Sequence, residues 1–194
     1  MLTPQFIPAI HYQAAARSEI LWICIHTMEV PCVTGMAQRC AHAMADPRGL
    51  RADSAHYACD PANVVQMVRE QDIAWHCRSD ATGTVNRLSI GVEHAGYTLG
   101  GTPTDWLHDP HAQGMVDLSA QLVADICSRY GVPVVHLTVE QIRAGERGIF
   151  AHVDATRAFG VPGGHVDGQT WEWAPYLAIV QALLHTPPAP EMQS

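Results

Sequence analysis

The sequence predicts an α/β domain in which a mixed central β-sheet is flanked by helices. Apolar runs typical of strands alternate along the chain with segments of helical periodicity, which is the pattern of a sheet covered by helices. The length of 194 residues suits one domain. Hydrophobic residues make up 47% of the chain, so it can bury a sizeable core without cross-links.

Each element rests on a local pattern. Strands are expected in short runs bounded by turn residues, at residues 21–25, 54–59, 63–68, 88–93 and 149–151. The second and third runs form a hairpin, because Asp60-Pro61-Ala62 between them supplies turn residues. Helices are expected from apolar spacing and capping residues, at residues 34–45, at 111–130, from Thr138 onward and at 171–185. The last helix requires Pro175 to lie in its first turn.

The charge balance narrows the class of partner. The formal net charge is −8, which disfavours nucleic acid and anionic membrane surfaces, since both are bound by basic faces. Protonation of the twelve histidines would make the net charge positive, so the electrostatic field of the protein depends on pH. The six cysteines form no C-x-x-C pair and lie in apolar or helical stretches, where we expect reduced, structural thiols.

The two ends of the chain differ from its middle. The first five residues carry neither the basic nor the apolar region of a signal peptide, and no apolar run approaches the roughly 20 residues of a membrane span. We therefore expect synthesis in a cytoplasm. We also expect an N-terminal extension over residues 1–19, a folded domain over 20–186, and a Pro-rich tail or linker over 187–194.

Histidines and aspartates gather late in the sequence. His152 ends a predicted short strand just before a loop, and His165 and Asp167 follow a Gly/Pro-rich turn. Far upstream, His26 ends another apolar strand, a common place for site residues in α/β folds. Zn²⁺ in hydrolytic sites uses three ligands of the His and Asp kind and leaves a fourth position for water. These segments can supply such a set, with either His165 or Asp167 as the third ligand.

Every one of these residues also has a purely structural interpretation, and His152, His165 and Asp167 could simply be surface loop residues. His26 could be a hydrogen-bonded core histidine, and Cys24, on the same face of the strand, could be a rival ligand or a buried thiol. Glu93 ends an apolar strand, where it suits either a general base facing a cleft or an ion pair with Arg87 or another arginine.

Three residues between the middle strands could meet a substrate. Trp75 and His76, with Asn86, lie on an apparent loop and suit a sugar- or peptide-binding wall, although Trp75 could also cover the core. Four further histidines are interpreted as solvated loop residues: His94, His108, His111 and His136.

Taken together, several segments resemble the zinc-dependent N-acetylmuramoyl-L-alanine amidases, the amidase-2 family related to peptidoglycan recognition proteins. In family order over about residues 20–183, they are Ile25-His26-Thr27, Ser54-Ala55-His56-Tyr57, Ala74-Trp75-His76, Asn86 with Ser89-Ile90-Gly91-Val92-Glu93, Ala151-His152 and His165-Val166-Asp167. The Glu-His-Ala-Gly sequence that begins at Glu93 is most similar to the amidase domain of endolysins from phages of mycobacteria and their relatives.

The resemblance implies a fold like that of peptidoglycan recognition proteins and makes residues 20–186 a zinc amidase domain. It implies one Zn²⁺ bound by His26, His152 and Asp167, with Glu93 as the catalytic glutamate. His165 stands where many members carry a lysine that faces the reacting carbonyl, so it is expected to donate a hydrogen bond to the oxyanion. Asp167-Gly168-Gln169 replaces the usual Asp-Pro-Gly.

The implied activity is hydrolysis of the amide bond between the lactyl group of N-acetylmuramic acid and L-alanine of the peptidoglycan stem peptide. Trp75, His76 and Asn86 would bind that substrate, and the protein would be a monomeric, phage-type lytic enzyme that reaches the cell wall after release. Two alternatives are a non-catalytic peptidoglycan-binding module and a cytoplasmic muropeptide-recycling amidase. Retention of Asp167 and Glu93 favours catalysis over binding alone.

Overall fold

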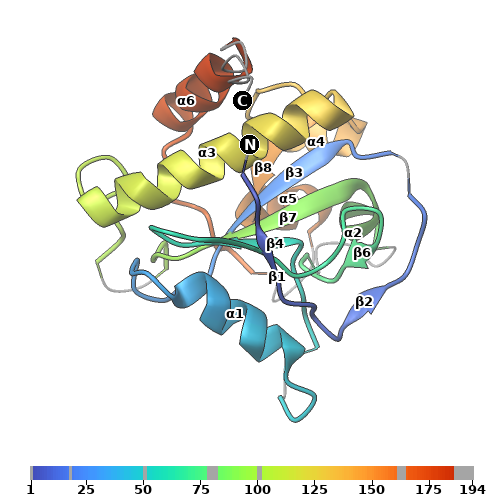
Figure 1. Cartoon of the computed structure of the whole chain (residues 1–194). Coiled ribbons are helices and arrows are strands. Elements are labelled where there is room, and N and C mark those ends of the chain that lie inside the picture. Colours follow the sequence, from blue (N-terminus) through green and yellow to red (C-terminus); the bar gives the residue numbers. More distant parts are fainter. Residues whose placement is uncertain are drawn as a thin grey trace, which may run out of the picture.

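A mixed six-stranded sheet organises the chain in this computed structural model, which describes residues 2–17, 19–49, 52–77, 83–99, 102–160 and 165–185. The strand order is β1–β5–β4–β7–β3–β8 (Figure 1). These strands are β1 (Gln5–Phe6), β3 (Trp22–Thr27), β4 (Tyr57–Cys59), β5 (Val64–Gln66), β7 (Ser89–His94) and β8 (Gly148–Ala151). Four neighbours, β4, β7, β3 and β8, run parallel, whereas β5 is antiparallel to β4. The predicted mixed sheet and hairpin are therefore confirmed.

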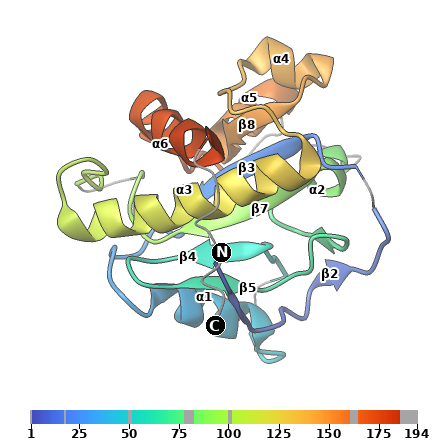
Figure 2. The same cartoon turned by 45° about the horizontal axis from the view of Figure 1, so that its top comes forward.

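Helices cover both faces of this sheet. They are α1 (Met36–Ala45), α2 (Thr84–Leu88), α3 (Pro110–Tyr130), α4 (Val139–Ala144), α5 (His152–Phe159) and α6 (Trp173–His185). Figures 1 and 2 show α3 and α6 on one face and α1 on the other. Within the described part of the chain, no helix is both long and apolar enough to cross a membrane.

The two faces of the central strands carry different residues. Ile23 and Ile25 of β3 pack in the cluster that includes α3 and α6, together with the apolar residues of β7. Trp22 and Cys24 alternate with them and face the opposite side. His26 continues this second series, so the period of the strand points its side chain away from α3 and α6.

The N-terminal residues join the fold by strand pairing. β1 lies parallel to β5 at the edge of the large sheet, and β2 (Tyr12–Gln13) pairs with β6 (Ile73–Ala74) in a separate antiparallel ladder. The expected limits of the extension and the domain stay predictions. The expected tail at 187–194 and the Gly/Pro-rich turn at 161–164 lie outside the described residues.

Two expectations about local structure are wrong. His152 begins helix α5 instead of preceding a loop, because the Asp154 carboxylate accepts the Ala151 N–H at 3.0 Å and caps the first turn. Asn86 lies in the short helix α2, not in a loop.

The expectation that His94 is solvated is also wrong. β7 extends one residue beyond Glu93, and its alternation turns His94 under α3, where it is fully buried. Its Nδ1 lies 2.9 Å from the main-chain oxygen of His26, and its Nε2 lies 2.6 Å from Ser119 Oγ. The other histidines of that group are exposed or half-buried: His108, His111 and His136. All six cysteines are reduced thiols, as expected.

A buried carboxylate links the sheet to the end of α3. Glu70 accepts hydrogen bonds from the Arg129 guanidinium and from the hydroxyls of Tyr57 and Tyr130, the latter two at 2.9 Å. Burial raises the pKa of Glu70, but the bonds and charge of Arg129 and the bonds from the two tyrosine hydroxyls together outweigh that effect and leave the pKa below its ordinary value.

We predict that Glu70→Gln lowers the free energy of unfolding by about 3 kcal/mol, since it leaves a guanidinium without its buried partner. Because folding lowers the pKa of Glu70, its contribution is complete above the ordinary carboxyl pKa and is lost as pH falls through the folded value. Urea unfolding across acidic pH should therefore show a weaker acid dependence in the variant. Asp125→Asn, which removes the exposed partner of Arg129, is the control and should cost less than about 1 kcal/mol. Equal losses from both variants would contradict this role.

Candidate metal centre and active-site cleft

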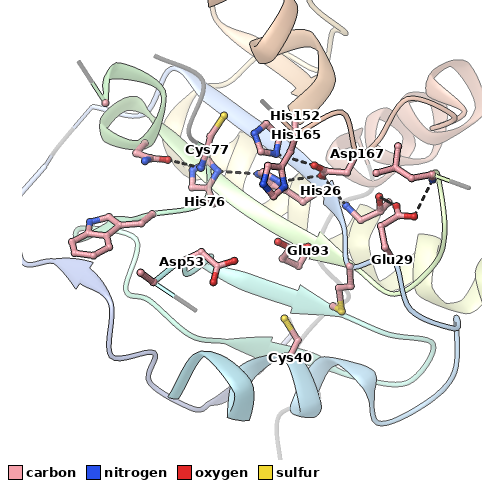
Figure 3. Close-up of a pocket in the computed structure, with 17 residues that line it drawn as sticks. His26, Glu29, Cys40, Asp53, His76, Cys77, Glu93, His152, His165 and Asp167 are labelled. Atoms are coloured by element: carbon pink, nitrogen blue, oxygen red, sulfur yellow. Dashed lines mark hydrogen bonds and ion pairs between the residues drawn. The ribbon is translucent and has the colours of Figure 1, made fainter. Parts of the chain in front are cut away.

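A cleft of about 620 Å³ opens at the carboxyl ends of the parallel strands (Figure 3). This is where α/β folds place their ligand sites, and the volume suits a small-molecule or peptide ligand. All eight residues predicted from the sequence line it: His26, Trp75, His76, Asn86, Glu93, His152, His165 and Asp167. The structure thus brings them together from segments far apart in the chain.

Three of these residues converge on one point. His26 Nδ1 lies 3.2 Å from Asp167 Oδ2, and His152 Nδ1 lies 2.9 Å from Asp167 Oδ1. The donor atoms of the three side chains all lie within 4.8 Å of one another, and the three residues are buried. His26 comes from β3, His152 from the first turn of α5, and Asp167 from the loop before α6.

The charges of this group favour a cation. Burial raises the pKa of Asp167, but its contacts with His152 and His26 outweigh that effect and hold the pKa well below the ordinary range. Burial lowers the pKa of His152, but Asp167 and Cys77 outweigh it and raise the pKa to about 10. A buried carboxylate that stays ionised therefore attracts positive charge to the space between the two imidazoles.

The donor set fits a divalent metal ion. Neither ring nitrogen of His152 makes a well-formed hydrogen bond with any described residue, despite the short distance to Asp167. Two imidazole nitrogens and a carboxylate oxygen are the ligands of catalytic zinc sites, in which a fourth position stays open to the cleft. Buried nitrogens without hydrogen bonds beside a carboxylate are what a metal ion would satisfy.

A second group of possible ligands fits less well. Cys24, His26 and His76 also place their donor atoms within 4.8 Å of one another. However, His26 Nε2 and His76 Nδ1 already share a hydrogen bond of 2.9 Å. Cys24 is fully buried and does not line the cleft that the described residues form. A metal there would have no open position for a reactant, so the group that contains Asp167 is the better candidate.

Glu93 faces the cleft beside this group. The parallel pairing of β3 with β7 sets Glu93 directly across from His26, so both side chains project from the same face of the sheet. Glu93 is only half-buried and lines the cleft, as Figure 3 shows. A carboxylate in this position can exchange protons with a molecule bound next to the two histidines.

The remaining predicted residues have different surroundings. Trp75 is 42% exposed at the rim, where its ring stacks on His11 at 5.9 Å. Asn86 accepts the main-chain N–H of Cys77 at 2.8 Å. His165 is exposed, and its ring stacks on that of His152 at 5.4 Å.

Comparison with known proteins agrees with this geometry. A family model described as N-acetylmuramoyl-L-alanine amidase matches residues 16–168. This chain belongs to that amidase family. No curated protein sequence matches it.

Solved structures share the amidase fold at low sequence identity. The catalytic domain of XlyA superposes with a TM-score of 0.64 at 15% identity, covering 92% of this chain and 99% of that one. The Staphylococcus aureus hydrolase AmiA in complex with its ligand gives a TM-score of 0.63 at 12% identity, covering 95% of this chain and 85% of that one. A Se-Met AmpD derivative gives a TM-score of 0.60 at 17% identity, covering 92% of this chain and 95% of that one. These likenesses establish the fold.

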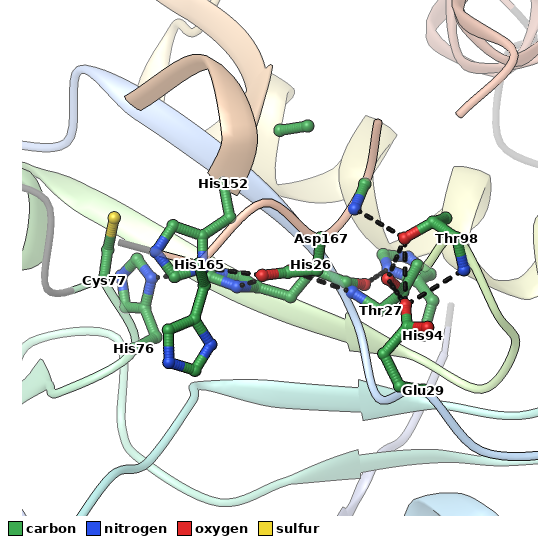
Figure 4. A network of polar contacts seen from close by, with 12 residues as sticks. His26, Thr27, Glu29, His76, Cys77, His94, Thr98, His152, His165 and Asp167 are labelled. Atoms are coloured by element: carbon green, nitrogen blue, oxygen red, sulfur yellow. Dashed lines mark hydrogen bonds and ion pairs between the residues drawn. The ribbon is translucent and has the colours of Figure 1, made fainter. Parts of the chain in front are cut away.

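The candidate site also depends on contacts that the sequence did not single out. Asp167 Oδ2 accepts the main-chain N–H of Thr27 at 3.2 Å (Figure 4). The main-chain N–H of Gly168, the residue after Asp167, donates to Thr98 Oγ1 at 2.9 Å. Glu29, held at a φ of 53°, accepts hydrogen bonds from the Thr98 main chain and hydroxyl at 3.0 and 2.9 Å. The feature that distinguishes Glu29 is its positive φ, and no sequence pattern predicts this backbone conformation.

The glycine after Asp167 is required by space as well as by conformation. Gly168 has a φ of 82°, and a Cβ there would lie 2.7 Å from the Cβ of Ala151. A side chain at this position would therefore push the ligand loop away from β8.

We predict that Gly168→Ala lowers the free energy of unfolding by about 2–3 kcal/mol, because backbone strain and a steric clash add together. Gly145→Ala is a matched control: its φ is 73°, but nothing lies within 4 Å of the added Cβ. This control should lower the free energy of unfolding by only about 1 kcal/mol. Urea unfolding of both variants measures the difference, and an equal cost would show that the contact with Ala151 is unimportant.

Proposed function

We propose that this protein hydrolyses the amide bond between the lactyl group of N-acetylmuramic acid and L-alanine of the peptidoglycan stem peptide. The observation that carries the proposal is the convergence of His26, His152 and Asp167 in the cleft, with Glu93 directly across the strand pair from His26. Membership of the amidase family supports the same reaction.

We propose Zn²⁺ as the metal, held by His26, His152 and Asp167. The nitrogen and carboxylate donors match its preferences. When bound, Zn²⁺ supplies Lewis acidity to the scissile carbonyl and to water. These three residues would hold the ion, and the Thr27 N–H orients the Asp167 carboxylate.

The protein's own groups would move the protons. Glu93 takes a proton from the attacking water and passes it to the leaving amine of L-alanine, as a general base and then a general acid. His165, whose main-chain oxygen accepts the Thr156 hydroxyl at 2.7 Å, lies at the mouth of the site and donates to the developing oxyanion. Trp75 offers an aromatic face at the rim for the sugar or the peptide.

The biological setting forms part of this proposal. We propose a monomeric lytic enzyme of the phage type, synthesised in the host cytoplasm and acting on the wall after release. A module that binds peptidoglycan without cutting it would need neither Glu93 nor a complete ligand set. A recycling amidase would cleave soluble muropeptides and leave intact sacculi untouched, so comparing these two substrates separates it from a lytic enzyme.

We predict that Glu93→Gln keeps zinc but lowers kcat by at least about 100-fold, because it removes the general base and no ligand. Asp167→Ala should lose both zinc and activity, because it removes a ligand. Release of new amino groups from purified peptidoglycan measures turnover, and atomic absorption measures zinc. A zinc-free Glu93→Gln protein would contradict the assignment, and a wild type that binds walls without releasing amino groups would indicate the binding module.

His165 should affect turnover without affecting the metal. We predict that His165→Ala lowers kcat about 10-fold or more with zinc retained, since one donor to the oxyanion is lost. His165→Lys should restore most of the activity, because an ammonium can donate to the same oxygen. Steady-state kinetics on soluble muramyl peptides would test this, and full activity of His165→Ala would exclude the role.

A further inference from the structure

A line of hydrogen bonds runs behind the candidate metal ligand His26. Its Nε2 lies 2.9 Å from His76 Nδ1, and His76 Nε2 lies 3.0 Å from the hydroxyl oxygen of Ser89. That hydroxyl in turn donates to the main-chain oxygen of Val85 at 2.5 Å. All three side chains in this line are buried.

The sheet is built to admit the His76 ring. Ser89, Gly91 and Glu93 alternate along one face of β7, and the ring lies over the middle position. A Cβ on Gly91 would lie 2.5 Å from Cγ of His76. The absence of a side chain at 91 therefore leaves the space in which His76 reaches both Ser89 and His26.

The carbonyl of Val85 fixes the direction of every bond in the line. A carbonyl oxygen can only accept, so the contact of 2.5 Å requires the Ser89 proton to point toward Val85. The Ser89 oxygen then accepts from His76, whose Nε2 must carry the proton. In the neutral ring His76 Nδ1 is consequently an acceptor, and His26 Nε2–H must donate to it.

When the His26 ring is neutral, as a metal ligand must be, this order leaves its Nδ1 without a proton, facing Asp167 Oδ2 at 3.2 Å. A lone pair turned toward a carboxylate is unfavourable unless a cation lies between them. We propose that Ser89 and His76 are positioning residues that hold His26 in its Nε2–H form, so that Nδ1 is the atom presented to the metal. The inference rests on the proposed function, because it requires a metal ion at His26, His152 and Asp167.

The same geometry gives His76 a role other than direct substrate binding. Both of its ring nitrogens are used, one by His26 and one by Ser89, and the residue is only 8% exposed. What it can offer a ligand in the cleft is the edge of its ring. Partners of this kind orient metal-bound histidines, and their loss typically weakens metal binding about 10–100-fold.

The protonation pattern can be read directly from the zinc-loaded protein. Long-range ¹H–¹⁵N correlation spectra should show His26 with a proton on Nε2 and zinc on Nδ1. Zinc on Nε2 of His26, with Nδ1 protonated, would overturn the inference while leaving the amidase proposal intact. Failure of the wild type to bind zinc at all would instead overturn the proposed function, so the two failures are distinguishable.

A pair of substitutions of similar size separates hydrogen bonding from packing. In His76→Asn the amide oxygen can still accept from His26 Nε2–H, whereas His76→Leu fills a similar volume without an acceptor. Competition with a chromophoric chelator should show zinc affinity lowered about 10–100-fold by His76→Leu and largely restored in His76→Asn. Equal affinity in the two variants, either both weak or both like the wild type, would refute the role of His76.

Ser89→Ala removes one oxygen and provides a test with little effect on packing. His76 then loses the acceptor that fixes its form, so a second population of His26, protonated at Nδ1, should appear in the spectrum and zinc affinity should fall. Ser119→Ala is the control, since it also removes a buried hydroxyl next to a histidine, but on the α3 face of the sheet. It should lower stability without changing zinc affinity. An unchanged spectrum and affinity in Ser89→Ala would refute the role of Ser89.

Discussion

One buried carboxylate, that of Asp167, holds the candidate site together. Its two oxygens face the imidazoles of His26 and His152, and it also accepts the main-chain N–H of Thr27. The main-chain oxygen of Asp167 accepts from Val153 at 3.2 Å, so the same residue joins the final loop to α5. A charge buried this deeply must be compensated, and the compensation brings β3, α5 and the loop to one point.

Side chains of the central strands alternate between the two faces of the sheet, so one face carries core residues and the other carries the candidate site. On one face of β3 and β7, isoleucine and valine pack beneath α3 and α6 as part of one core cluster. On the other face, His26 and Glu93 face the cleft, while Ser89 and Gly91 hold and admit His76. A rigid strand pair therefore fixes both the metal ligand and the candidate proton carrier, which suits a site that must keep its geometry.

The sequence predicts elements well where a pattern is local. The apolar run of β3, the helical spacing of α3 and the turn between β4 and β5 are all visible in the residues themselves, and all three elements are confirmed. The burial of His94 cannot be predicted locally, because it depends on where β7 ends and on α3, which lies far along the chain. The start of α5 at His152 was missed because Asp154, not a residue before the helix, caps it.

The site residues, like the elements, divide into those that the sequence indicates and those that only the three-dimensional contacts reveal. Eight of the residues that line the cleft are candidates from local patterns, and the resemblance to a family gives them their joint roles, because a family encodes distant contacts that no single segment reveals. The support around them was not predicted: Glu29 acts through an uncommon backbone conformation, and Ser89 acts through a carbonyl one helical turn before it. Such contacts are set by hydrogen-bond direction and by space, which appear only in three dimensions.

One wall of the cleft depends on residues that precede the family match. The match begins at residue 16, yet β2 pairs with β6, and His11 stacks on Trp75 at the rim. Trp75 also donates its main-chain N–H to Ser54 at 2.9 Å, so its backbone is anchored while His11 packs on its ring. An aromatic ring fixed in this way loses little conformational freedom when a ligand stacks on it. The N-terminal segment thereby contributes to the cleft as well as to the sheet, although it supplies none of the groups proposed to carry out the reaction.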